Sequence, residues 1–313
     1  MDELEKLKGM VFGLAAGDAL GVPVEFEDRD YCRCNPVSGM QGFGFHKQPA
    51  GTWSDDASMT FCTMEAMLGD FSPALLGKNF LRWLQDGWWT PHGIVFDKGI
   101  ATSDALHRLA RGVPADLSGG ADEMSNGNGS LMRIAALAWH PETADAAFLK
   151  LVKDASSITH CHPRSVLACH FYLKFLRLLM QHPKEKAFEA VQLEWPSLIR
   201  ELWPDAAPEL SHFGRLLRAD FAALPEDAIE SHGYVMHSLE ASVWCLLNSD
   251  SYPEAVLKAV NLGWDTDTSA AVCGALAGAF YGYSSIPKEW ISILARTNEI
   301  ENLALRFHGK FCL

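Results

Sequence analysis

Small residues recur at intervals of four in two segments near opposite ends of the chain. The first set is Gly9, Gly13, Gly17 and Gly21, and the second is Ala270, Gly274, Gly278 and Gly282. Residues four apart lie on one face of an α-helix, and a face without bulky side chains lets another backbone approach closely. We therefore predict that helices within residues 3–21 and 261–283 cross with these faces in contact. The alternative is that the glycines merely accumulate near turns.

The second segment begins with acidic and hydroxyl side chains. Asp265 and Asp267 alternate with Thr266 and Thr268 just before the glycine–alanine pattern. Asp and Thr are favoured where a helix begins, because they accept hydrogen bonds from its free backbone N–H groups. Two carboxylates in an apolar setting repel each other unless a cation lies near them, and Mg²⁺ prefers oxygen ligands of this kind. The pattern predicts a metal-ligand cluster on a buried helix.

A similar cluster, Ser54, Asp55 and Asp56, precedes a strongly helical run. A single Asp at this position is explained as a helix N-cap that the helix dipole favours. Two adjacent carboxylates between Trp53 and an apolar helix exceed what a cap requires. The aspartates of the two clusters together carry enough negative charge to neutralise two divalent cations, and Ser54 and Thr268 add neutral oxygens.

The bulk composition is typical of a soluble globular protein with a sizeable core. Hydrophobic residues make up 48% and charged residues 21% of the 313 residues. The net charge of −13 disfavours a nucleic-acid backbone as the main partner. The acidic N-terminus is a poor signal peptide, and no apolar stretch is expected to span a bilayer. Eight scattered cysteines favour reduced thiols, so we expect a cytoplasmic protein without membrane association.

Helical periodicity extends over most of the chain, including residues 172–260 and the C-terminal segment. No β-alternation of convincing length and no linker interrupt it, so we predict one all-α domain over residues 1–313. Residues 29–51 form a predicted long loop, a feature that is often functional. Residues 119–133 are rich in Gly and Asn and precede an apolar segment, IAALAWH, that we predict to be helical. Free N–H groups before a helix form a natural anion cradle, but no nucleotide motif is matched.

Six motifs in sequence resemble those of the ADP-ribosylglycohydrolases, and they span nearly the whole chain. They are GLAAGDALGVPVEF, GTWSDDASM, FDKG, NGNGSLMR, ITHCHP and GWDTDTSAAVCGALAGAFYG. The resemblance implies an orthogonal all-α helical bundle with two Mg²⁺ or Mn²⁺ ions in a central cleft that binds ADP-ribose. It also implies a monomer.

The resemblance assigns roles to individual positions. The implied metal ligands are Ser54, Asp55, Asp56, Asp265, Asp267 and Thr268. The implied catalytic carboxylates are Glu25, near the metals, and Asp97, near the scissile ribose. The implied substrate contacts are Ser125, Gly127, Asn128, Gly129 and His160. Two departures stand out, because many members have Thr where this chain has Ala57 and Gly where it has Trp264. Ala57 removes a hydroxyl near the metal ligands, and Trp264 is expected to reshape the acceptor side of the cleft.

The resemblance implies hydrolysis of the bond between the ribose anomeric carbon and a modified protein side chain, most often arginine. Metals would lower the pKa of a water molecule, and Glu25 or a ligand Asp would take its proton. Three alternatives remain open at this point. The linkage could be to serine, to an O-acetyl group or to a nucleic-acid base; the protein could bind ADP-ribose without catalysis; or it could be a metal phosphohydrolase, which free phosphate would reveal.

Overall fold

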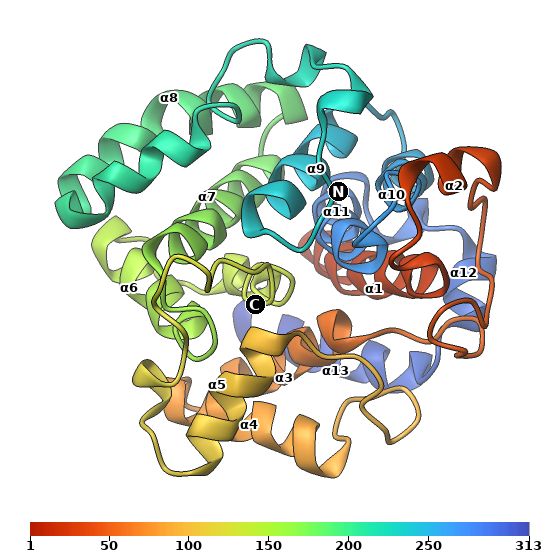
Figure 1. Cartoon of the computed structure of the whole chain (residues 1–313), viewed down its shortest axis with the longest axis horizontal. Helices are drawn as coiled ribbons and strands as arrows, with labels where there is room; N and C mark the ends of the chain where they lie inside the picture. The colour runs from red at the N-terminus through yellow and green to blue at the C-terminus, as the bar shows by residue number, and fades with distance from the viewer. Residues whose placement is uncertain (313) are drawn as a thin grey trace.

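The computed structural model describes residues 1–312, and within them the protein is built from α-helices and short 3-10 helices, with isolated β-bridges but no β-strand (Figure 1). The α-helices are α1 (Glu3–Gly21), α2 (Arg29–Cys34), α3 (Asp55–Leu68), α4 (Pro73–Asp86), α5 (Ile100–Ala110), α6 (Asp145–Ser156), α7 (Pro163–Leu179), α8 (Lys184–Leu202), α9 (Val235–Leu247), α10 (Tyr252–Val260), α11 (Thr266–Tyr281), α12 (Lys288–Ile293) and α13 (Thr297–Phe311). The 3-10 helices are η1 (Val22–Val24), η2 (Ala115–Leu117), η3 (Ala135–Trp139), η4 (Pro204–Phe213), η5 (Phe221–Ala223), η6 (Glu226–Ala228) and η7 (Tyr283–Ser285). The predicted all-α fold class is confirmed.

The centre of the fold is the crossing of α1 and α11, which make the most extensive helix contact in the protein. A Cβ atom added to Gly9 would lie 2.0 Å from the carbonyl oxygen of Gly278. Further along, Gly13 meets Gly274 in the same way, and Gly17 meets Ala270. The predicted contact between the two small-residue faces is therefore confirmed. The two helices run antiparallel, so the C-terminal end of α1 lies against the N-terminal end of α11.

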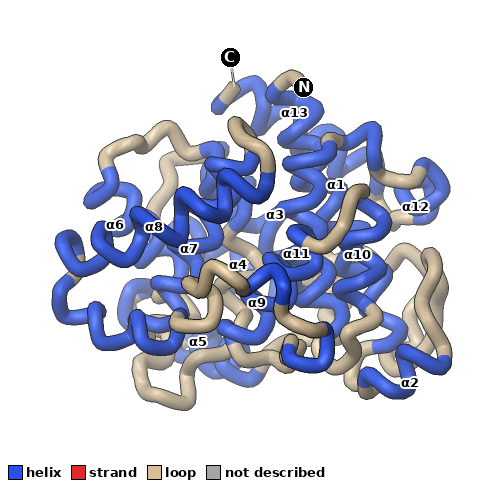
Figure 2. Tube along the Cα trace, turned by 90° about the horizontal axis from the view of Figure 1, so that it is seen from above, coloured by secondary structure: helices blue, strands red, loops and turns tan. Residues whose placement is uncertain are grey.

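The other helices surround this central pair. Figures 1 and 2 both show α6, α7 and α8 at one end of the molecule and α2, α10 and α12 at the other. Helix α11 also packs on α9 and α10, while α3 packs on α4 and α13. Buried apolar side chains from these helices form one continuous core. Both central helices are therefore enclosed by protein.

The expectation that no apolar segment could span a bilayer needs a correction. The segment Glu3–Val24 is long and apolar enough to do so by length and composition. In this fold, however, 94% of the most apolar window of that segment is buried inside the protein. Its apolar character is explained by its position at the centre of the core, because a helix that is covered on all sides is apolar all round.

Two local predictions also differ from the structure. The IAALAWH segment forms the short 3-10 helix η3 instead of an α-helix. Its residues are buried on all sides, so periodicity does not distinguish the two conformations. Pro141 then favours the extended backbone of His140 that ends η3. The predicted loop at 29–51 begins with α2, which is capped by the side chain of Asp28.

Candidate active site

The N-termini of α3 and α11 face each other deep in the protein, and each carries one of the predicted acidic clusters. The Thr268 hydroxyl lies 3.3 Å from Oδ2 of Asp56, and the Ser54 hydroxyl lies 3.0 Å from the same oxygen. The two clusters therefore meet at one carboxylate. This meeting follows from the register of α1 and α11, which places Gly21 directly against the backbone of Asp267.

Asp18 of α1 fixes the start of α3, and sequence reasoning missed this role. Its Oδ1 accepts a hydrogen bond of 2.7 Å from the backbone N–H of Ser54, and its Oδ2 accepts one of 2.9 Å from that of Ala57. Asp18 is fully buried, and burial raises its pKa to about 7. One helix thus anchors both acidic clusters, by packing for α11 and by hydrogen bonds for α3. The available signal was a single charged residue within the apolar, glycine-rich stretch of residues 9–21.

The acidic groups present a site that fits a divalent cation. Oδ1 of Asp56 is buried and has no hydrogen-bond partner among residues 1–312. Carboxylate oxygens of Glu25, Asp265 and Asp267 lie within 4.8 Å of one another. Burial, reinforced by repulsion between carboxylates, raises the pKa values of Asp55, Asp56 and Asp267. An unpartnered oxygen among crowded carboxylates is the environment that a hard cation such as Mg²⁺ or Mn²⁺ stabilises.

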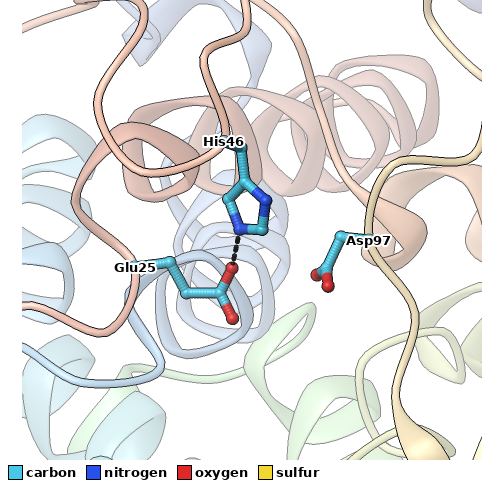
Figure 3. Close-up of side chains that lie close together, drawn as sticks. All are labelled: Glu25, His46 and Asp97. Carbon is cyan, nitrogen blue, oxygen red and sulfur yellow. Dashed lines mark hydrogen bonds and ion pairs between the residues drawn. The ribbon is translucent and has the colours of Figure 1, made fainter.

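Glu25, His46 and Asp97 form a second group beside the acidic cluster (Figure 3). Nε2 of His46 forms a hydrogen bond with Oε2 of Glu25, and the carboxylate of Asp97 lies near this pair, on the side away from the Glu25 backbone. Burial, together with repulsion from Asp97, raises the pKa of Glu25 to about 10. Burial lowers the pKa of His46. His46 was not predicted as a site residue, although the long loop that carries it was predicted to be functional.

A cleft of about 370 Å³ opens above these groups. Nine of the thirteen predicted site residues line it: Glu25, Asp55, Asp97, Gly127, Asn128, Gly129, His160, Asp265 and Thr268. Ser54, Asp56 and Asp267 are buried outside the cleft lining, among the hydrogen bonds described above. Ser125 does not line the cleft, and its side chain lies next to Gly120 instead. The structure therefore brings the predicted metal ligands, catalytic carboxylates and substrate loop to one place.

Comparison with known proteins agrees with this arrangement. The sequence profile described as ADP-ribosylglycohydrolase matches residues 1–313. The chain belongs to the ADP-ribosylglycohydrolase family. It is 34% identical over 307 residues to the ADP-ribosylarginine hydrolase Tri1 of Serratia proteamaculans (strain 568), a match that covers 97% of this chain and 79% of the relative.

A second relative is the ADP-ribosyl-[dinitrogen reductase] glycohydrolase of Rhodospirillum rubrum, which is 26% identical over 308 residues, covering 93% of this chain and 90% of the relative. A solved structure titled ADP-ribosylglycohydrolase-related protein complex superposes with a TM-score of 0.75 at 32% identity, covering 98% of both chains. The expected class of enzyme, a hydrolase of glycosidic bonds, is thus confirmed at the level of the family.

In this family member, the glycine-rich loop is tied to the acidic cluster. The side-chain amide of Asn128 donates hydrogen bonds of 2.7 Å to Oδ2 of Asp265 and 2.8 Å to the Ser238 hydroxyl. Both side-chain amide hydrogens are therefore used inside the protein, and the backbone N–H of Asn128 also donates within it, to the carbonyl oxygen of Gly233. A Cβ atom on Gly129 would lie 2.8 Å from Cε1 of His160. Glycine at this position lets the loop lie against that ring.

The two departures from the family pattern lie at different depths. Ala57 is buried beside the α3 N-terminus, and its backbone N–H is held by Asp18. Trp264 is 39% exposed, has a positive φ of 64° and packs against His232 with 4.7 Å between ring centroids and the ring planes tilted by 41°. A left-handed backbone at a bulky residue is costly. Trp264 lies outside the cleft lining and lines a separate surface pocket with Arg29 and Glu230, so its expected effect on the acceptor side of the cleft stays a prediction.

Proposed function

We propose that this protein removes ADP-ribose from arginine side chains of proteins by hydrolysing the N-glycosidic bond at the ribose anomeric carbon, assisted by two divalent cations. The relatives named above support the ADP-ribosyl linkage, and the first of them, by its name, acts on ADP-ribosylarginine. The cation requirement rests on the chemistry of the carboxylates, and its identity as Mg²⁺ or Mn²⁺ on their preference for hard cations.

The observation that carries the proposal is the composition of the cleft. Carboxylates from the starts of two helices line the cleft together with the Gly127–Gly129 loop and His160. A ligand with sugar hydroxyls and a diphosphate matches these two kinds of lining group, because hydroxyls bind carboxylate-held cations and phosphates bind backbone N–H groups of glycine-rich loops. The cleft thus offers groups for the reacting ribose and groups for the rest of ADP-ribose.

The proposed metal ligands are Ser54, Asp55, Asp56, Asp265, Asp267 and Thr268. When bound, the two cations would supply Lewis acidity that polarises the ribose oxygens and lowers the pKa of the attacking water. Every other contribution comes from the side chains that surround them. Because Asp18 and the α1–α11 contact fix the starts of α3 and α11, the oxygens of the proposed metal ligands are positioned before a cation or substrate binds.

Glu25 is the proposed general base, because divalent cations held beside it would offset the repulsion that raises its pKa and would leave its carboxylate ionised. Its carboxyl group lies beside Asp265 and Asp267 and is oriented by its hydrogen bond with His46. It accepts a proton as the oxygen of water bonds to the anomeric carbon and the bond from that carbon to the guanidinium nitrogen breaks. The departing guanidine gains a proton, so that one water is consumed and an unmodified arginine side chain and free ADP-ribose are formed. Asp97, which has a carboxylate oxygen within 4.8 Å of one of Glu25, is proposed to face the leaving group.

A panel of linkages tests this proposal. The protein is incubated with ADP-ribosylarginine, ADP-ribosylserine and O-acetyl-ADP-ribose, and free ADP-ribose and phosphate are quantified. We expect ADP-ribose from the arginine conjugate, no release of phosphate, and loss of the activity in Glu25→Gln but not in Asp116→Asn, an exposed control. Preferential cleavage of the serine conjugate would show that the acceptor is serine and not arginine. ADP-ribose binding without cleavage of any conjugate would identify a non-catalytic relative.

We further propose that residues 1–313 act as one domain, as a monomer and in the cytoplasm. None of the eight cysteines forms a disulfide, which supports a reducing compartment. Light scattering of the purified protein tests the monomer, and fractionation of the producing cell tests the location.

A further inference from the structure

The ring of His160 is buried in the wall of the cleft with only one nitrogen committed to the protein. Its Nδ1 lies 2.8 Å from the hydroxyl of Thr159. Its Nε2 has no hydrogen-bond partner among residues 1–312 and lies against the glycine loop, 3.3 Å from where a Cβ atom on Gly127 would be. The side chain lines the cleft. The nitrogen that faces the ligand is therefore Nε2, and its protonation state decides whether it donates or accepts.

Arg133 determines the direction of the hydrogen bonds that reach His160. Its Nη2 lies 2.7 Å from the Thr159 hydroxyl, and a guanidinium only donates. The Thr159 oxygen therefore accepts from Arg133, and its own hydrogen needs an acceptor. The Thr159 side chain is fully buried, and within residues 1–312 the only other partner of its hydroxyl is Nδ1 of His160. A proton on Nδ1 would leave the threonine O–H buried without a partner, which native structures avoid.

The charge state of the His160 ring agrees with this relay of hydrogen bonds, which runs from Arg133 through the Thr159 hydroxyl to Nδ1 of His160. Burial, together with the nearby Arg133, lowers the pKa of His160 to about 3. The imidazole is therefore neutral at physiological pH and carries a single proton. Burial also lowers the pKa of Arg133, but only to about 10, so the guanidinium remains charged. Arg133 is held by stacking on Phe80 and by donating to the carbonyl oxygens of Gly129 and Ala155.

We propose that Arg133 and Thr159 are positioning residues that hold His160 as its Nε2–H tautomer, so that the cleft presents a fixed hydrogen-bond donor to an oxygen of the bound ADP-ribosyl group. The identity of that group rests on the proposed function, whereas the tautomer rests on the protein alone. Since Arg133 also donates to Gly129, the same guanidinium holds both the glycine loop and the histidine. A rigid donor contributes more to binding than one that must first reorganise.

The tautomer is measured directly in the free protein. With ¹⁵N-labelled histidine, long-range ¹H–¹⁵N NMR distinguishes a protonated from an unprotonated ring nitrogen. We expect Nδ1 of His160 to be unprotonated and Nε2 to be protonated. The reverse assignment in the wild-type protein would overturn the proposal, whatever the enzyme's activity. An enzyme that shows the expected tautomer but releases no ADP-ribose would leave the relay intact and refute the proposed function.

Thr159 variants test whether the hydroxyl is responsible. Thr159→Val keeps the shape of the side chain but lacks the hydroxyl, and Thr159→Ser is the matched control that retains it. By calorimetry we expect Thr159→Val to bind ADP-ribose about tenfold more weakly than wild type, a loss of about 1.4 kcal/mol in binding free energy. Its NMR spectrum should show a mixture of the two His160 tautomers. Thr159→Ser should bind within about twofold of wild type. His160→Gln, which keeps an N–H donor, should bind more tightly than His160→Leu. Wild-type affinity and an unchanged spectrum in Thr159→Val would contradict the relay.

Discussion

The close contact between α1 and α11 leads to a prediction about Gly13→Ala. A Cβ atom at this position would lie 2.4 Å from the carbonyl oxygen of Gly274 and 3.0 Å from a ring carbon of Tyr252. An ordinary contact between such atoms is 3.4 Å or more, so the helices must separate by about 1 Å. The opposing oxygen belongs to the backbone of a buried helix and cannot rotate away.

The magnitude follows from two opposing terms. Overpacking of this kind costs about 1–3 kcal/mol, and the rigid backbone places Gly13→Ala at or above the upper end. Alanine in a helix regains up to about 1 kcal/mol relative to glycine. We therefore expect a net loss of about 2 kcal/mol in the free energy of unfolding. In a chain of 313 residues, that loss lowers the melting temperature by about 3 °C.

Gly309 of α13 provides a matched control. It is exposed and helical, and an added Cβ atom would meet no atom within 4 Å. Gly309→Ala should raise the free energy of unfolding by up to about 1 kcal/mol through helix propensity alone. Urea denaturation of both variants measures the difference. If Gly13→Ala were as stable as Gly309→Ala, the proposed tight contact between the two small-residue faces would be refuted.

Three further predictions concern the site and its surroundings. Asp18→Asn replaces one of two acceptors for backbone N–H groups by an NH₂ group, and should cost about 1–3 kcal/mol in urea denaturation; an unchanged midpoint would contradict the anchoring role. Burial raises the pKa of Glu240 to about 7, so its stabilising contribution is present below pH 4.5 and is lost as the pH rises through 7. Between pH 4.5 and pH values above 7, the free energy of unfolding of the wild type should therefore fall by up to about 3 kcal/mol relative to that of Glu240→Gln. Parallel curves of unfolding free energy against pH for the two proteins would refute this. Mg²⁺ or Mn²⁺ at one hundred times its dissociation constant should stabilise the chelator-treated protein against unfolding by about 2.7 kcal/mol for each site filled, and Asp56→Asn should abolish the shift.

Several central features could be predicted from local sequence patterns. Small residues four apart predicted the α1–α11 contact, because the helical repeat alone places them on one face. Paired carboxylates at two predicted helix starts, such as Asp55 and Asp56, predicted a shared acidic site, because an N-cap explains only one of them. The family resemblance then identified the cleft residues that such patterns do not reveal, including Asp97 and His160.

Other features depend on contacts between segments that no local pattern records. Asp18 caps a helix whose N-cap residue, Ser54, lies 36 residues further along the chain, so capping rules that use neighbouring residues do not detect it. His46 reaches Glu25 from a loop whose path is set by tertiary packing. The donor and acceptor roles in the hydrogen bonds that link Arg133 to His160 can be deduced only when the positions of the Arg133, Thr159 and His160 side chains are known. In each case the decisive quantity is a distance between residues that the sequence does not place together.

The most direct test of the account is the release of ADP-ribose from an ADP-ribosylarginine protein with Mg²⁺, with Mn²⁺ and with chelator. The wild-type protein should release ADP-ribose only when a divalent cation is present. Asp267→Asn should lose this activity while remaining folded, and Asp116→Asn should retain it. Equal release in chelator, or full activity in Asp267→Asn, would contradict the central claim that the two acidic helix starts form a metal-assisted hydrolytic site.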